Sequence, residues 1–199
     1  VMSNIRFAGD HAGGCIKFTG SYNVLDGMVC LGNANVSGVA AITLNNCIRN
    51  HFSDIVTRFY RLINAASGTN NEITLVGGNN EGSTDVSINI GSSCNRWNIS
   101  GVTISGMTST TGTAPILLDG NFCRLSDCIV YDASNVEAGI EDTGTDSSII
   151  GCSVISIVDG ADGDGHGIKI NGANRSGVQN CQIYNVDGHG IYVKDAAAD

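Results

Sequence analysis

The pentapeptide Asp-Gly-His-Gly-Ile occurs twice in this sequence, starting at Asp164 and again 23 residues later at Asp187. If each copy opens one turn of a repeating structure, His166 stacks on His189 and the two aspartates also stack, about 4.8 Å apart. Two imidazoles and two carboxylates at one corner could perform general acid–base chemistry or hold a divalent cation. The alternative is that Asp and His simply tolerate the tight glycine turn that the repeat imposes.

Three aspartates precede or open the first copy of the pentapeptide. Asp159, Asp162 and Asp164 alternate with glycine and alanine in a loop that is longer than the repeat needs. Their carboxylates could bind Ca²⁺, but the downstream glutamate of an EF-hand loop is absent, and alternating Asp and Gly is also typical of a solvated turn. We therefore expect no resident metal or cofactor, with Ca²⁺ at these three residues as the alternative.

The elements that position these groups are short strands that recur along the whole chain. Alternating apolar strands are predicted to start at 16, 42, 62, 88, 116, 140, 168 and 191, which is a mean spacing of 25 residues over seven steps. A second signature has two apolar residues three apart and a third two further on, and the step of three marks a turn. It occurs at Ile99, Val102 and Ile104; at Leu125, Cys128 and Val130; at Ile149, Cys152 and Val154; and at Val178, Cys181 and Ile183.

A unit of this size with three strands and no helix cannot bury its apolar side chains alone, so neighbouring units must stack. We predict an all-β fold, a single-stranded right-handed parallel β-helix of about eight coils of about 25 residues, forming one domain over residues 1–199. The 27 glycines, with asparagine, supply positive-φ corners, and the single proline suits uninterrupted ladders. Residues 52–63 have the spacing of an amphipathic helix, but the repeat favours an irregular coil with a bulge.

Charge and cysteine content exclude several classes of protein. The formal charge of -9 repels nucleic acid and anionic membrane surfaces, and no apolar run is long enough for a membrane helix. None of the eight cysteines has Cys-x-x-Cys spacing. Cys128, Cys152 and Cys181 occupy one position in three successive units, which predicts a buried ladder of free thiols. Pairing among the other five is left open, and a mainly reduced protein made in a cytoplasm fits best.

The coil pattern over nearly the whole chain resembles the pectin-lyase-like superfamily of right-handed β-helices, which includes polygalacturonases, pectate lyases and bacteriophage tailspike depolymerases. Gly-His-Gly at 165–167 resembles a polygalacturonase motif, and Tyr-Val-Lys at 192–194 resembles its Arg-Ile-Lys with the arginine lost. The positions of that family's acidic motifs hold Ala-Pro at 114–115 and then Glu137. Pectate lyases use calcium with an arginine base, and the nearest arginine, Arg175, is predicted to lie away from this corner.

The resemblance implies a module of the tailspike type that recognises, and in one version degrades, a polysaccharide. As an enzyme it would be a glycoside hydrolase or a polysaccharide lyase. Its candidate catalytic residues are Glu137, Asp164, His166, Asp187, His189 and Lys194. The alternative is a structural module without catalysis, such as a capsid decoration or a fibre on a virion or cell surface.

Outward aromatic side chains could stack on sugar rings. Tyr184 and Tyr192 alternate with inward apolar residues and are predicted to bind substrate. Phe59, Tyr60 and Tyr131 are further candidates, and Trp97 is predicted either to face outward or to join the core. An acidic face with outward tyrosines suits a neutral or basic glycan better than a polyanion.

The expected partners are a polysaccharide or other virion or surface subunits, with a homotrimer as one possible assembly. A solenoid needs capping units, and neither end of this sequence resembles one, so we expect a fragment or subunit of a larger assembly. The predicted location is the virion, with an extracellular location as the alternative.

Overall fold

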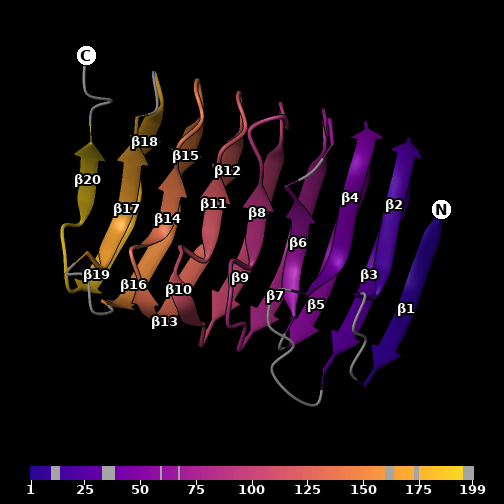
Figure 1. The fold of residues 1–199 in the computed structure, drawn as a ribbon, viewed down its shortest axis with the longest axis horizontal. Helices are drawn as coiled ribbons and strands as arrows, with labels where there is room; N and C mark the ends of the chain where they lie inside the picture. Colours follow the sequence, from indigo (N-terminus) through magenta and orange to yellow (C-terminus); the bar gives the residue numbers. More distant parts are fainter. Residues whose placement is uncertain are drawn as a thin grey trace.

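The computed structural model describes residues 1–9, 14–32, 39–58, 60–66, 68–159, 164–172 and 175–194. It is all-β, and its parallel strands wind into a solenoid of about seven turns with about 24 residues per turn, which confirms the predicted parallel β-solenoid. Figure 1 shows the coils stacked in sequence order from the N-terminal to the C-terminal end. No helix in the described part of the chain is long and apolar enough to cross a membrane.

Two parallel sheets form the walls of the solenoid. The eight-stranded sheet runs through β2 (Ile16–Ser21), β4 (Ala40–Ile48), β6 (Arg61–Ala65), β8 (Ile88–Ile90), β11 (Ile116–Leu118), β14 (Ala138–Asp142), β17 (His166–Asn171) and β20 (Ile191–Lys194). The main path of the twelve-stranded sheet runs through β1 (Met2–Ala8), β3 (Val24–Leu31), β5 (His51–Arg58), β7 (Thr74–Glu81), β9 (Asn98–Ser105), β12 (Arg124–Ser126), β15 (Ser148–Ile150) and β18 (Gly177–Gln179). Its remaining strands are β10 (Thr108–Gly112), β13 (Ile129–Val136), β16 (Ser153–Val158) and β19 (Gln182–Val186).

The register of the eight-stranded sheet follows the predicted strand starts at every position except one. Ile42 pairs with Ile63, which in turn pairs with Ile88, so the predicted start at Leu62 is wrong by one residue. Leu62 and Ile63 are both fully buried, and hydrophobicity alone therefore does not show which of them continues the column. The full column is Ile16, Ile42, Ile63, Ile88, Ile116, Ile140, Ile168 and Ile191.

The apolar signature with a step of three comes from a bend at a positive-φ residue in the other sheet. This bend lies inside β9 and, in the later coils, between β12 and β13, between β15 and β16, and between β18 and β19. Ile99 stacks on Leu125, and Gly101 between Ile99 and the next inward residue has a φ of 63°. Residues 52–58, the described part of this segment within β5, belong to the same pattern, because Asp54 lies in β5 with a φ of 51°. This bend places two inward residues three positions apart, which is also the spacing of a helix. The prediction that this segment is a coil of the solenoid and not a helix is therefore confirmed. The expected bulge is wrong for the described residues, because β5 pairs with both neighbouring strands without a register shift.

The core is continuous along the solenoid and contains the largest aromatic side chains. Trp97 is buried, which settles its position in the core. Tyr60 is also buried, and its hydroxyl donates to the Gly9 carbonyl at 2.9 Å, so the expectation that it could stack on a sugar is wrong.

The cysteines follow the column predicted for them. Cys128 and Cys152 are buried, Cys181 is partly buried, and all three are free thiols in successive coils, as predicted. Cys47, Cys94 and Cys123 are also free and buried, whereas Cys15 and Cys30 form a disulfide.

Candidate functional site

The repeated pentapeptide lies where the chain enters β17 and β20 of the eight-stranded sheet. Gly188 is required there, because a side chain would collide with the Asp164 carbonyl and the His166 ring of the coil below. The close stacking brings together a group that we call the Lys169 corner, consisting of Glu137, Glu141, Asp164, His166, Lys169, His189 and Tyr192.

Lys169 is the centre of the corner. It points outward from β17, yet its side chain is only 7% exposed because three acidic residues surround its ammonium group. Nζ forms an ion pair with Glu137 Oε2, and lies 3.6 Å from Asp164 Oδ2 and 3.7 Å from Glu141 Oε1. The side chains of Glu137 and Asp164 are 44% and 39% exposed, so these two carboxylates remain open to solvent.

Burial and charge act in opposite directions on this network. Burial alone would lower the pKa of Lys169, but the hydrogen bond to Glu137 and the charges of the neighbouring carboxylates outweigh it and raise that pKa. Burial raises the pKa of Glu141, and the nearby Lys169 only partly opposes this shift. Lys169 therefore stays charged and holds the acidic groups together.

Two imidazoles and a phenol form a stack beside the ion pairs. The ring centroids of His166 and His189 are 5.4 Å apart, and the Tyr192 ring lies 4.5 Å from His166 and 5.6 Å from His189. The backbone N–H of His189 donates to His166 Nδ1 at 3.0 Å, so the neutral His166 ring carries its proton on Nε2, 3.7 Å from Asp164 Oδ1. Burial lowers the pKa of His166 despite the nearby Asp164, and the ring is neutral at pH 7.

Two predicted catalytic residues lie outside this network. The Asp187 carboxylate accepts a hydrogen bond from the backbone N–H of Asp159 at 3.0 Å. Lys194 is exposed and pairs in register with Asn171, further along the strand than Tyr192, which pairs with Lys169. The carboxylates of the corner form their ion pairs with Lys169 rather than with Lys194.

The two tyrosines predicted to bind substrate lie on different sheets. Tyr192 belongs to β20 of the eight-stranded sheet, whereas Tyr184 is 56% exposed on β19 of the twelve-stranded sheet. Arg175 bonds to Asp146 at 2.7 Å and is not part of the corner.

Sequence reasoning missed Lys169 and Glu141. Both occupy the outward position of an alternating strand that follows glycine, and they pair in register in successive coils. Opposite charges in matching positions one coil apart were the signal that could have revealed them.

The predicted calcium loop is only partly within the described chain. Asp162 lies outside the described residues, so Ca²⁺ at Asp159, Asp162 and Asp164 stays a prediction. In the described ranges, no three His, Cys, Asp or Glu side chains are grouped so that they could hold a metal ion.

Comparison with known proteins gives one structural similarity. No protein-family model matches the sequence, and no curated protein matches it. A solved structure of "Geobacillus virus E2 - ORF18" aligns with a TM-score of 0.41 and 15% sequence identity. The alignment covers 98% of this chain and 50% of that one, so this chain spans about half the length of that protein.

Proposed function

We propose that this solenoid recognises a polysaccharide and contacts it at the Lys169 corner. One observation carries the proposal: two solvent-exposed carboxylates, Glu137 and Asp164, lie on the same surface as the rings of His189 and Tyr192. Carboxylates accept hydrogen bonds from sugar hydroxyls, and ring faces pack against the apolar face of a pyranose. Because three carboxylates face one ammonium group, the corner favours a neutral or basic sugar.

The proposed setting is the surface of a virion, where the solenoid would be one subunit of a larger assembly, with a homotrimer as the proposed form. Six of the eight cysteines are free, which supports synthesis in a mainly reducing compartment, whereas the disulfide between Cys15 and Cys30 is the one feature that favours an oxidising one among the described cysteines. Membership of the pectin-lyase-like superfamily and a role of the tailspike type are also part of this proposal.

Binding is tested with two matched tyrosine variants on a glycan array that holds neutral, amino and acidic polysaccharides. We expect Tyr192→Ala to weaken binding to the recognised glycan by at least about tenfold, because a stacking surface is lost. Tyr184→Ala removes an exposed tyrosine from the other sheet and should leave binding unchanged. Equal losses in both variants, or no binding by the folded wild type, would refute the Lys169 corner as a glycan site and leave it as a structural network.

A second candidate function, hydrolysis of the bound glycan, is favoured by the contact of two exposed carboxylates with the same ammonium group. Glu137 and Asp164 both contact the Lys169 ammonium, so their nearest oxygens are at most about 6 Å apart, a limit that includes the separation of roughly 5–5.5 Å between the two carboxyl groups of a retaining glycosidase. One carboxylate would attack the anomeric carbon while the other protonates the leaving oxygen, and water would then release the sugar.

This second function is tested by the appearance of reducing ends. The wild type should release them from the bound glycan, whereas Glu137→Gln and Asp164→Asn should bind without cleavage. Binding by the wild type without reducing ends would rule out hydrolysis and keep recognition.

A further inference from the structure

One corner of the solenoid carries large side chains where the backbone favours glycine. At the exit of the eight-stranded sheet, successive coils place a residue with φ between 56° and 62° in the same position. This column is Tyr22, Arg49, Glu72, Arg96, Phe122, Asp146 and Arg175. Such a conformation is unfavourable for residues other than glycine, asparagine and aspartate, above all for bulky ones.

A second positive-φ column, within the twelve-stranded sheet, provides an internal comparison. It contains only glycine, asparagine and aspartate: Asn4, Gly27, Asp54, Gly77, Gly101, Asp127, Gly151 and Asn180. In that column the positive φ occurs only at the residue types that adopt it most easily. The large charged and aromatic residues of the first column therefore serve a purpose other than the turn, and strained backbone of this kind concentrates at functional sites.

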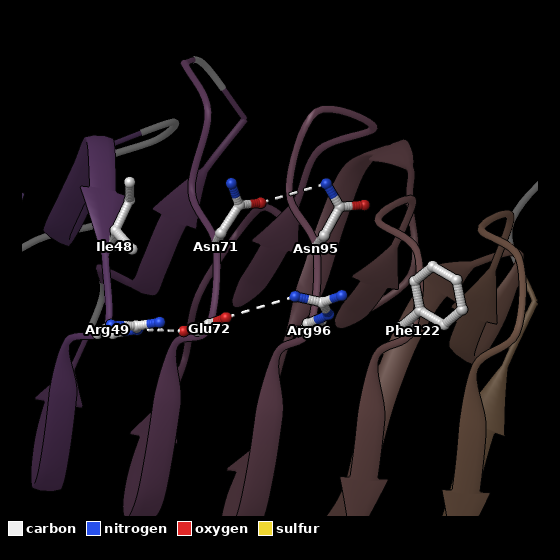
Figure 2. A pocket seen from close by; sticks show the side chains of 7 residues that line it. All are labelled: Ile48, Arg49, Asn71, Glu72, Asn95, Arg96 and Phe122. Carbon is white, nitrogen blue, oxygen red and sulfur yellow. Dashed lines mark hydrogen bonds and ion pairs between the residues drawn. The ribbon is translucent and has the colours of Figure 1, made fainter.

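Four of these large side chains line a pocket of about 390 Å³, together with Ile48, Asn71 and Asn95. Figure 2 shows them in two rows, with Arg49, Glu72, Arg96 and Phe122 in one row and Ile48, Asn71 and Asn95 in the other. Pockets for small ligands usually have volumes of about 300–1,000 Å³, so this one can hold a single small molecule.

The charges of the pocket are partly paired within it. Arg49 Nε donates to Glu72 Oε2 at 2.5 Å, and Arg96 Nη1 donates to Glu72 Oε1 at 3.3 Å. The Arg49 hydrogen bond lowers the pKa of Glu72, which therefore stays charged and neutralises one of the two guanidinium groups. One positive charge remains in a chain whose net charge is -9.

Arg96 and Phe122 are the two residues most open to a ligand. The Arg96 side chain is 68% exposed, and its bond to Glu72 is its only side-chain hydrogen bond to the described residues. Phe122 is 55% exposed and follows Arg96 by one coil. In the second row, Asn95 Nδ2 donates to Asn71 Oδ1 at 3.2 Å, which leaves the Asn95 oxygen and the Asn71 amide N–H groups for hydroxyl groups of a ligand.

We propose that this pocket binds an acidic sugar, with its carboxylate on Arg96, its ring against Phe122 and its hydroxyls on Asn71 and Asn95. A guanidinium group can bind a carboxylate through two parallel hydrogen bonds, and an aromatic face packs against the carbon face of a pyranose. The site lies at a different corner from the Lys169 corner and does not depend on the function proposed there.

The test titrates the wild-type chain with glucuronate, glucose and acetate by isothermal calorimetry and by ¹H–¹⁵N NMR. We expect glucuronate to bind at least about tenfold more tightly than glucose, which lacks the carboxylate, and than acetate, which lacks the ring. Backbone signals of residues 95–96 and 121–122 should shift on binding. Equal binding of glucose or of acetate would overturn the assignment of an acidic sugar.

Variants then test the two contacts. Arg96→Gln and Phe122→Ala should each weaken glucuronate binding at least about tenfold. Arg175→Gln is the matched control, because Arg175 lies in the same column with a φ of 61° but outside the pocket and pairs with Asp146. Unchanged binding by Arg96→Gln, or an equal loss in Arg175→Gln, would overturn the site. Tyr192→Ala should keep glucuronate binding, so failure of the first proposal is distinguishable from failure of this one.

Discussion

Replacing Lys169 with methionine removes the ammonium group from three carboxylates and keeps most of the side-chain volume. Glu141 is then left nearly buried with its pKa already raised by burial, beside Glu137 and Asp164. We expect Lys169→Met to lower the stability of the C-terminal coils strongly at pH 7 and much less in acid.

The magnitude follows from the burial of each carboxylate. Removing one partner of a buried ion pair costs about 3–5 kcal/mol. The side chains of Glu137 and Asp164 are partly exposed and regain water, which places the expected loss near the lower limit, about 3 kcal/mol. For a chain of this size, that corresponds to a melting temperature lower by about 6–12 °C.

The pH dependence follows from the directions of two pKa shifts. The pKa of Lys169 is raised in the fold, so its stabilisation is complete below pH 10.5 and is lost only above that. The pKa of Glu141 is also raised, so its neutral form favours the fold below pH 4.5 and this contribution is lost as the pH rises. At pH 4 the Glu141 carboxyl, whose pKa burial raises, is mostly neutral, and the loss should shrink to about 1 kcal/mol.

Urea unfolding followed by circular dichroism at pH 7 and pH 4 measures this difference, and hydrogen exchange in β14 and β17 locates it. Lys17→Met is the matched control, because Lys17 is an exposed residue at the same outward position of the eight-stranded sheet, near its other end. A loss in Lys169→Met below about 1 kcal/mol at pH 7, or one equal at both pH values, would refute the ion-pair account.

Three further predictions concern other parts of the chain. Because the pKa of His166 is lowered in the fold, its stabilisation is complete above pH 6.5 and lost below it; His166→Gln should therefore flatten the dependence of the melting temperature on pH between pH 7 and pH 5, and an unchanged dependence would contradict this. Phe122→Gly should raise stability by about 0.5–1 kcal/mol in urea, because glycine relieves the positive φ, and a loss would contradict the strain described for its column. In the folded protein iodoacetamide should modify Cys181 before Cys123, because Cys123 is buried and burial raises its pKa to about 12; modification of Cys123 as fast as Cys181, measured by mass spectrometry of the peptides, would contradict this.

The repeat was predictable from the sequence because each coil repeats its inward side chains. Seven of the eight predicted strand starts share one column, and the second signature marks the bend at Gly101 and its counterparts. The helical spacing of residues 52–63 was ambiguous for the same reason: a positive-φ residue inside a strand separates two inward residues by three positions, as a helix turn does. The difference between Leu62 and Ile63 was beyond prediction, since both are apolar and both are buried.

The candidate sites were less predictable, because outward side chains repeat less regularly than inward ones. The pentapeptide indicated the stack of His166 on His189, whereas Lys169, which organises the acidic groups, was part of a predicted strand and not one of the predicted catalytic residues. The pocket around Arg96 was missed for a further reason. Glycine and asparagine were taken as the corner residues, and a positive φ at arginine or phenylalanine contradicts that rule.

This exception separates the side chains that build the solenoid from those that serve another purpose. At each positive-φ corner the backbone alone favours glycine, asparagine or aspartate, and the column through Gly101 contains only these types. Where Arg49, Arg96 and Phe122 take the same conformation, the solenoid is less stable than it would be with glycine. In a repeat protein such a loss of stability is confined to a few coils, because each coil contacts only its neighbours. The large residues at this corner therefore mark a binding site, because they lower the stability of the solenoid. Replacing them with glycine should raise its stability and weaken binding.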